Sequence, residues 1–363
     1  MEKKNNTLEE LNTVKRKKLT DSSFSVMLIG AAIMVFAAIV TGILFMAMMS
    51  KRNLLDMNEA EEYSKHYVYI ISDKESDLWI NVLNEVKAIA DESNIYIEDI
   101  EETMGVNYSD EDLLRVAVNS GVDGIIYSGI KSEKVMILID KAVTKGMAVV
   151  VLQNDIDSSI RQCFIGVNNY ELGRLYASQI KKIATPKQLS NMKIELLTDA
   201  DMTEGSTNLI SLAMEEKLEE YIGDYSLPEV KITRLSARDM FSAEEDIRNF
   251  FVGDKKLPDI IICLNDSYTK CVYQALVDYN RVGEVQIIGY YSDDTILEAV
   301  DKGIIYSTVS PDTEKMGELC MKALEEYCET GYTNAFMSVN AKVIGRDEAR
   351  ELLNERQNEQ TQD

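Results

Sequence analysis

Histidine and tryptophan are nearly absent from this chain of 363 residues, which contains one of each, His66 and Trp79. A Ser-His-Asp triad or a histidine-rich metal site would depend on His66 alone, without the partners that a base or a ligand needs. The sequence also lacks a phosphate-binding loop motif. We therefore expect a protein that is not an enzyme, with no catalytic residue, no metal site and no cofactor.

Cysteine is also scarce, because the chain has five cysteines and no Cys-x-x-Cys pair. Cys263 lies within an apolar run and Cys163 directly precedes one, and free cysteines pack well in protein cores. An odd number of cysteines in a chain of this length does not indicate a disulfide scaffold.

Basic residues are fewer than acidic ones. The chain has 38 lysines and arginines and 62 aspartates and glutamates, which gives a formal net charge of −24. Such acidity disfavours binding to nucleic acid or to an anionic membrane surface through charge. We expect no nucleic-acid partner and attribute the acidity to solubility.

One apolar run, Phe24–Met49, contains no charged residue and is long enough to cross a bilayer. Lys15–Lys18 precede it and only Lys51-Arg52 follow it, so the positive-inside rule places residues 1–23 in the cytoplasm and the bulk of the chain outside the cell. A cleaved signal peptide and an uncleaved anchor are both possible interpretations. The length of the run favours a single-pass anchor in the cell membrane, followed by a charged stalk at residues 50–65.

Beyond the stalk, short apolar runs alternate with segments of helical spacing, which is typical of an α/β fold with parallel sheets. The expected strands are Tyr67–Ile71, Ile95–Ile100, Gly124–Ser128, Ala148–Leu152, Phe164–Val167, Lys193–Thr198, Val230–Leu235, Ile260–Leu264, Val285–Gly289, Ile304–Val309 and Phe336–Val343. The expected helices are Leu78–Ser93, Asp110–Ser120, Ser132–Lys145, Tyr170–Ile183, Ser206–Tyr221, Ala243–Phe251, Tyr268–Tyr279, Asp293–Asp301, Pro311–Gly331 and Arg346–Arg356.

The stretch Pro258–Val309 has the most informative order: a buried strand, Asn265-Asp266, a helix, a strand ending at Gly289, a helix, a glycine and a strand. This order resembles the C-terminal lobe of type I periplasmic binding proteins, the sugar-binding proteins of the ribose/galactose class, which are related to LacI-type repressor cores. The run F-I-G-V-N-N-Y-E-L-G at Phe164–Gly173 resembles the first crossing between the lobes of that family. The resemblance extends from about Tyr67 to about Arg350.

The resemblance implies two Rossmann-like lobes with parallel sheets, joined by a hinge that the chain crosses several times. The apolar run Phe24–Met49 predicts one transmembrane helix before these lobes. The N-terminal lobe is expected at residues 66–167 and 311–338, the C-terminal lobe at 168–310 and 339–356, and a disordered tail at 357–363. The N-terminal segment shows no helix-turn-helix pattern, which disfavours the repressor branch of the family.

Ligands of open α/β sheets bind beyond the carboxyl ends of the strands, so the candidate ligand-binding residues lie in the loops after the strands. They are Asp77, Trp79, Gln153, Asn154, Asn208, Asp266, Tyr291 and Ser310. Each has a structural alternative: Asp77 and Asp266 are also suited to cap helices, Trp79 to pack on its helix, Gln153 and Asn154 to form a polar turn, and Tyr291 to pack at the hinge.

The resemblance also shows where this chain departs from a sugar site. Relatives often have Asp-Arg where this chain has Gln153-Asn154, and an arginine in the helix where this chain has Asn208. They use Gln near Ser310 and an aspartate shortly after the glycine that precedes Tyr290-Tyr291. The amides can still recognise hydroxyl groups.

Two functions are consistent with these residues. The first is an extracytoplasmic solute-binding protein that closes its lobes on a small polar ligand, a sugar or a similar compound, and serves an ABC transporter permease or a membrane sensor kinase. The second is a ligand-independent accessory or sensor-interaction protein with a degenerate cleft.

Overall fold

The structure is a computed structural model that describes residues 40–41, 63–71, 73, 76–104, 108–200, 202–235, 240–252 and 256–360. Apart from residues 40 and 41, the predicted membrane segment Phe24–Met49 lies outside these residues, as does the predicted cytoplasmic segment. Within the described part of the chain, no helix combines the length and apolar character that spanning a membrane requires. The folded part reaches into the predicted stalk, because the Ser64 amide donates to the Asn94 carbonyl at 2.9 Å and Lys65 begins a strand.

The first sheet contains six parallel strands. In spatial order they are β11 (Phe336–Val339), β5 (Cys163–Val167), β4 (Ala148–Leu152), β3 (Gly124–Ser128), β1 (Lys65–Ile71) and β2 (Ile95–Asp99). Every residue of β3 and β4 is buried, as expected for nearly continuous apolar runs that are covered on both faces.

The second sheet has the same number of strands, of which only the edge strand β12 is antiparallel to its neighbour. The order is β12 (Ala341–Ile344), β10 (Ser307–Pro311), β9 (Gln286–Tyr290), β8 (Ile260–Cys263), β6 (Lys193–Asp199) and β7 (Glu229–Leu235). These two parallel-dominated sheets confirm the α/β fold predicted from the sequence.

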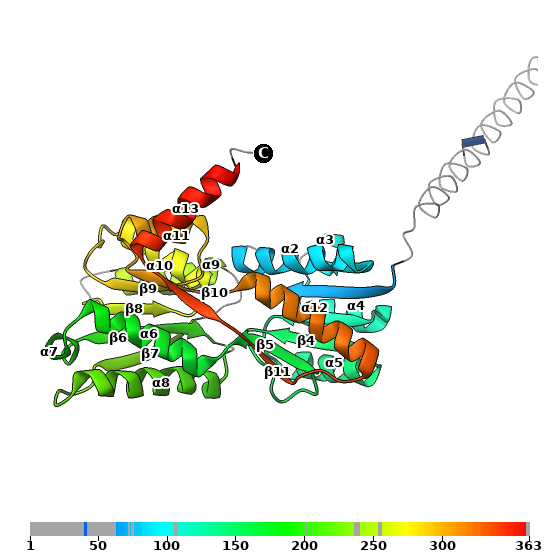
Figure 1. Cartoon of the computed structure of the whole chain (residues 1–363), viewed down its shortest axis with the longest axis horizontal. Coiled ribbons are helices and arrows are strands. Elements are labelled where there is room, and N and C mark those ends of the chain that lie inside the picture. Colours follow the sequence, from blue (N-terminus) through cyan, green and yellow to red (C-terminus); the bar gives the residue numbers. More distant parts are fainter. Residues whose placement is uncertain are drawn as a thin grey trace, which may run out of the picture. The chain divides into compact units, whose positions relative to one another are not determined.

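Helices cover both faces of each sheet (Figure 1). They are α2 (Asp77–Glu92), α3 (Ile100–Met104), α4 (Asp110–Ser120), α5 (Glu133–Thr144), α6 (Asn169–Ile183), α7 (Pro186–Leu189), α8 (Glu204–Ile222), α9 (Met240–Phe251), α10 (Asp266–Asp278), α11 (Asp294–Asp301), α12 (Thr313–Thr330) and α13 (Arg346–Gln360). On the first sheet, α2 packs against α12 and α4 against α5; on the second, α6 packs against α8 and α9 against α10.

The chain passes between the two sheets three times. It leaves the first sheet after β5, returns after β10 through α12, and leaves again between β11 and β12. The sequence predicts one strand over Phe336–Val343, and this prediction is wrong because the strand breaks at Asn340. Residues before Asn340 pair with β5 and residues after it pair with β10.

Several other boundaries differ from the sequence prediction by a few residues, and two of them have a clear physical meaning. The last strand of the Pro258–Val309 stretch begins at Ser307 rather than Ile304, because the amides of Ile304 and Ile305 both donate to the Ala299 carbonyl and close the end of α11. Helix α13 continues past the predicted end at Arg356 to Gln360, so the first residues of the predicted disordered tail are helical.

Gly173 allows the close packing of α6 on α8. A Cβ atom at this position would lie 2.3 Å from the Ile210 carbonyl oxygen and 2.9 Å from the Ala213 Cβ. The first contact is with backbone, so relief requires the two helices to move apart. Gly205, which lies in the first turn of α8, has open space, since a Cβ atom there would meet only the Thr203 hydroxyl oxygen, at 3.9 Å.

We predict that Gly173→Ala lowers the free energy of unfolding by about 1–3 kcal/mol, which is the usual cost of overpacking. Gly205→Ala is the matched control and should be neutral or slightly stabilising, since alanine is the better helix former. Urea denaturation of both variants tests this. Equal stabilities of the two variants would contradict the close-packing argument.

Candidate functional site

A cavity lies where strands of both sheets end. Asp73 follows β1, Gln153-Asn154 follow β4, and Asn265-Asp266 follow β8. Its volume is about 80 Å³. The residues that line it are Asp73, Trp79, Ser128, Gly129, Ile130, Gln153, Asn154, Asp199, Asn265 and Asp266. Its position agrees with the general location of ligand sites in parallel α/β sheets.

Direct contacts join the two sides of this cavity. The Ser267 hydroxyl, at the start of α10, donates a 2.7 Å hydrogen bond to the Asp73 carboxylate of the other side. The Lys270 ammonium lies 3.4 Å from the Asp77 carboxylate on α2. A volume of about 80 Å³ is below the roughly 300 Å³ at which small-molecule pockets begin. A sugar-sized ligand therefore requires these contacts to loosen before it can enter.

Asp266 is the most unusual group of the cavity. Its side chain is only 4% exposed, and its Oδ2 atom has no hydrogen-bond partner among the described residues. Burial raises the pKa of Asp266 to about 6; Lys270 pulls the value down and the negative charge of Asp73 pushes it up. Asn265, rather than Asp266, caps α10 by accepting a hydrogen bond from the Tyr268 amide at 2.7 Å. The capping alternative for Asp266 is thus not what the structure shows.

Lys270 connects carboxylates from the two sides. Its Nζ atom lies 3.4 Å from Asp77, 3.6 Å from Asp266 and 3.4 Å from Asp293. Burial lowers its pKa, but the three carboxylates outweigh that effect and the net pKa is raised. Lys270 is therefore a charged lysine that three carboxylates share.

Trp79 contacts the core and the cavity together. It is buried in an apolar cluster that includes residues of both sheets, and its carbonyl accepts a 3.0 Å hydrogen bond from the Tyr69 hydroxyl. The same side chain lines the cavity. Packing on its helix and contact with a ligand are thus not exclusive for this residue.

The Gln153-Asn154 turn has a special backbone. Gln153 has a φ of 56°, which is in the left-handed region. Its backbone N–H donates a 3.0 Å hydrogen bond to the Ile165 carbonyl. The next residue but one, Asp155, forms an ion pair with Arg161 at 2.5 Å. This pairing anchors the turn and leaves both amide side chains on the cavity wall.

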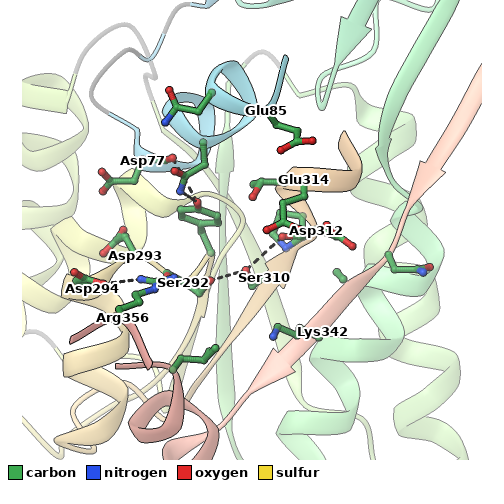
Figure 2. A pocket seen from close by; sticks show the side chains of 18 of the residues that line it. Asp77, Glu85, Ser292, Asp293, Asp294, Ser310, Asp312, Glu314, Lys342 and Arg356 are labelled. Carbon is green, nitrogen blue, oxygen red and sulfur yellow. Dashed lines mark hydrogen bonds and ion pairs between the residues drawn. The ribbon is translucent and has the colours of Figure 1, made fainter. Parts of the chain in front are cut away.

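Three other predicted residues, Asp77, Tyr291 and Ser310, line a separate open groove of about 1320 Å³ beside the crossings between the sheets (Figure 2). The Tyr291 hydroxyl accepts a 2.5 Å hydrogen bond from the Asn81 side chain on α2, and the Ser310 hydroxyl pairs with Ser292 at 2.9 Å. Tyr291 also has a φ of 73°. Its position therefore matches the alternative of a tyrosine packed at the hinge.

Asn208 is not brought to the cavity. It is exposed on α8, next to the buried Thr207. Among the eight predicted residues, the cavity collects Trp79, Gln153, Asn154 and Asp266.

The sequence prediction missed several cavity residues. Asp73, Ser128, Asp199 and Asn265 each lie at or directly after the end of a strand, so the carboxyl-end rule could have selected them. Lys270 does not line the cavity but pairs with Asp266 from the second turn of α10, a position for which the sequence offered no such signal. Among the described residues, no group of His, Cys, Asp and Glu side chains is arranged to hold a metal ion.

Comparisons with known proteins agree with this architecture. A family model described as periplasmic binding protein domain matches residues 67–332, and the chain belongs to this family. The resemblance to type I periplasmic binding proteins is thereby confirmed. A comparison with curated protein sequences finds no match.

Solved structures share the fold at low identity. GanP, a glucose-galactose binding protein from Geobacillus stearothermophilus, is 20% identical with a TM-score of 0.63, over 79% of this chain and 99% of that chain. A sugar ABC transporter sugar-binding protein from Bacillus halodurans is 20% identical with a TM-score of 0.61, over 79% and 99%. The XylFII-LytSN complex contains a chain that is 18% identical with a TM-score of 0.62, over 78% and 98%.

The raised pKa of Asp266 predicts a pH-dependent stability. Below about pH 3.8 the carboxyl is protonated in the folded and the unfolded states and costs nothing; as the pH rises through about 6, the buried charge destabilises the folded state by up to about 3 kcal/mol. Asp266→Asn should therefore be more stable than wild type at neutral pH, with a difference that disappears towards pH 4.

Chemical denaturation across this pH range measures the effect. Asp224→Asn, at an exposed turn residue after α8, is the matched control and should follow the wild type at every pH. An Asp266→Asn variant that is less stable than wild type at neutral pH would show that the carboxylate stabilises the fold.

Proposed function

We propose that this protein is an extracytoplasmic solute-binding protein whose two lobes close on a small polar ligand, a sugar or a sugar-like compound. The observation that carries the proposal is the cavity at the carboxyl ends of strands from both sheets, lined by Trp79 and by amide, hydroxyl and carboxylate groups. A ligand held there touches both lobes. It binds the closed arrangement better than the open one, which is the condition for ligand-driven closure.

The composition of the cavity supports a ring-shaped polyol as the ligand. Trp79 offers an apolar surface to a sugar ring, while Gln153 and Asn154 can both donate to and accept from hydroxyl groups. Solved structures with the same fold include complexes with D-arabinose, myo-inositol and D-allose. These relatives support the ligand class without identifying the ligand of this chain.

A ligand screen tests the proposal. The full-length chain in mild detergent is titrated with aldoses, cyclitols and amino sugars by calorimetry, and a ligand should also raise the melting temperature by mass action. Asn154→Ala, which removes one amide from the cavity wall, should weaken binding roughly 3- to 10-fold.

Asn208→Ala is the matched control, because Asn208 is an exposed residue away from the cavity. Its affinity should equal that of the wild type. Equal loss in both variants, or no loss in either, would place the ligand outside this cavity.

The partner is an ABC transporter permease or a membrane sensor kinase. Solved structures with this fold include a sugar-binding protein of a sugar ABC transporter and a chain of the XylFII-LytSN complex, which supports a role of this fold in transport and in protein complexes. Closure of the lobes is the signal that either partner would receive.

The membrane attachment rests on the uncharged apolar run Phe24–Met49, which is preceded by Lys15–Lys18. We expect the full chain to sediment with membranes and to resist extraction by high salt or carbonate. A version starting at Lys51 and exported by an unrelated cleavable signal should be released. Carbonate extraction of the full chain would argue for a cleaved signal peptide.

A second function is favoured by one feature of the same cavity. The hydrogen bond between Ser267 and Asp73 and the ion pair between Lys270 and Asp77 join the two sides of the small cavity directly. A ligand-independent accessory protein would use this closed form to hold a membrane partner. Absence of binding across the ligand screen would favour this function over the first.

A further inference from the structure

The charge balance at the cavity is strongly negative. Asp73, Asp199 and Asp266 line it, and none of the lining residues that the structure describes is a lysine or an arginine. The nearest cation to Asp266 is Lys270, at 3.6 Å, and Lys270 is shared with Asp77 and Asp293. One positive charge thus serves three carboxylates, and the cavity keeps an excess of negative charge.

Asp266 is the most deeply buried of the three carboxylates that line the cavity. The residue is only 3% exposed on the cavity wall, and its Oδ2 atom has no hydrogen-bond partner in the described part of the chain. An isolated buried carboxylate is costly unless a donor or a cation meets it. The raised pKa of Asp266 is the result of this burial and of the nearby negative charge of Asp73.

The other polar groups that line the cavity are suited to recognise hydroxyl groups. The Asp73 carboxylate accepts from Ser267, and the Asp199 carboxylate accepts from the Asn265 amide at 2.8 Å. Gln153 and Asn154 add amides that can both donate and accept. The cavity therefore combines a surface that can recognise a polyol with one buried carboxylate, Asp266, whose Oδ2 atom is met only at 3.6 Å by the Lys270 ammonium that Asp77 and Asp293 share.

We propose that the cavity selects an amino sugar, a polyol with one protonated amino group that meets Asp266 Oδ2, over the neutral parent sugar. This inference rests on the proposed function and specifies the ligand class of the same site. An ammonium group satisfies the hydrogen bond and compensates the charge of Asp266, whereas a hydroxyl group satisfies only the hydrogen bond. A carboxylated sugar adds a further negative charge and is repelled.

The test compares matched ligands on the full-length chain in mild detergent, by calorimetry at about pH 7, where a sugar amine is largely protonated. The hexosamines D-glucosamine, D-galactosamine and D-mannosamine are each compared with their neutral parent and their N-acetyl derivative, and D-glucuronate serves as the acidic analogue. At least one hexosamine should bind roughly 10- to 100-fold tighter than its parent and its N-acetyl form, with D-glucuronate weakest.

Asp266→Asn should reduce this preference to within about threefold while the protein stays folded, since the variant removes the negative charge and keeps the side-chain shape. Asn208→Ala is the control and should keep the full preference. Thermal melting of each variant separates a loss of binding from a loss of fold.

Three results would overturn the inference. Tighter binding of the neutral parents would reject the amine while leaving the proposed solute-binding function intact. An amine preference that survives Asp266→Asn would reject the role of Asp266. Failure of every ligand in the panel to bind would reject both the amino-sugar ligand and the sugar-binding function, and would favour the accessory protein.

Discussion

The parallel orientation of the strands is the constraint on which the rest of this structure depends. In a parallel sheet all strands end on the same edge, so the residues that follow them gather there without any need for proximity in sequence. Asp73 and Asn154 meet in this way on one sheet, and Asp199 and Asp266 on the other. The crossings of the chain bring both edges to one cavity, which a single sheet could not enclose.

The strands were the most predictable part of the fold, because buried parallel strands are nearly continuous apolar runs such as Ala148–Leu152. The break at Asn340 was not predictable by the same reasoning. Residues on both sides of it have the composition of an edge strand, and only pairing with two different sheets separates β11 from β12. Sequence pattern reports burial, whereas the choice of sheet depends on contacts with distant segments.

The site was predictable to the level of loops but not of individual side chains. Asp77 and Trp79 are two positions apart on α2, which rotates them by about 200° around the helix axis, so they cannot share one face. The structure accordingly places Trp79 on the cavity and Asp77 on the open groove. Asn208 does not line the cavity for a related reason. Its neighbour Thr207 lies on the buried face of α8, so Asn208 is exposed to solvent.

The carboxylates around Lys270, which are Asp77, Asp266 and Asp293, link ligand binding to the stability of the fold. Lys270 links Asp77 to Asp266 and Asp293 and so joins the two sides directly. Because this lysine is shared, the buried charge of Asp266 is incompletely compensated, which lowers the stability of the folded protein. A ligand that donates a hydrogen bond to Asp266 or compensates its charge would restore part of this lost stability on binding.

The break between β11 and β12 has a consequence for the order in which the protein forms during synthesis. The first sheet is not complete until β11, and its cover is not complete until α12, although most of its strands lie in the first half of the chain. A nascent chain therefore exposes the apolar edge of β5 and the face that α12 will cover while the whole second sheet is being made. The cover of the earliest strands therefore depends on segments that are made last, up to residue 339.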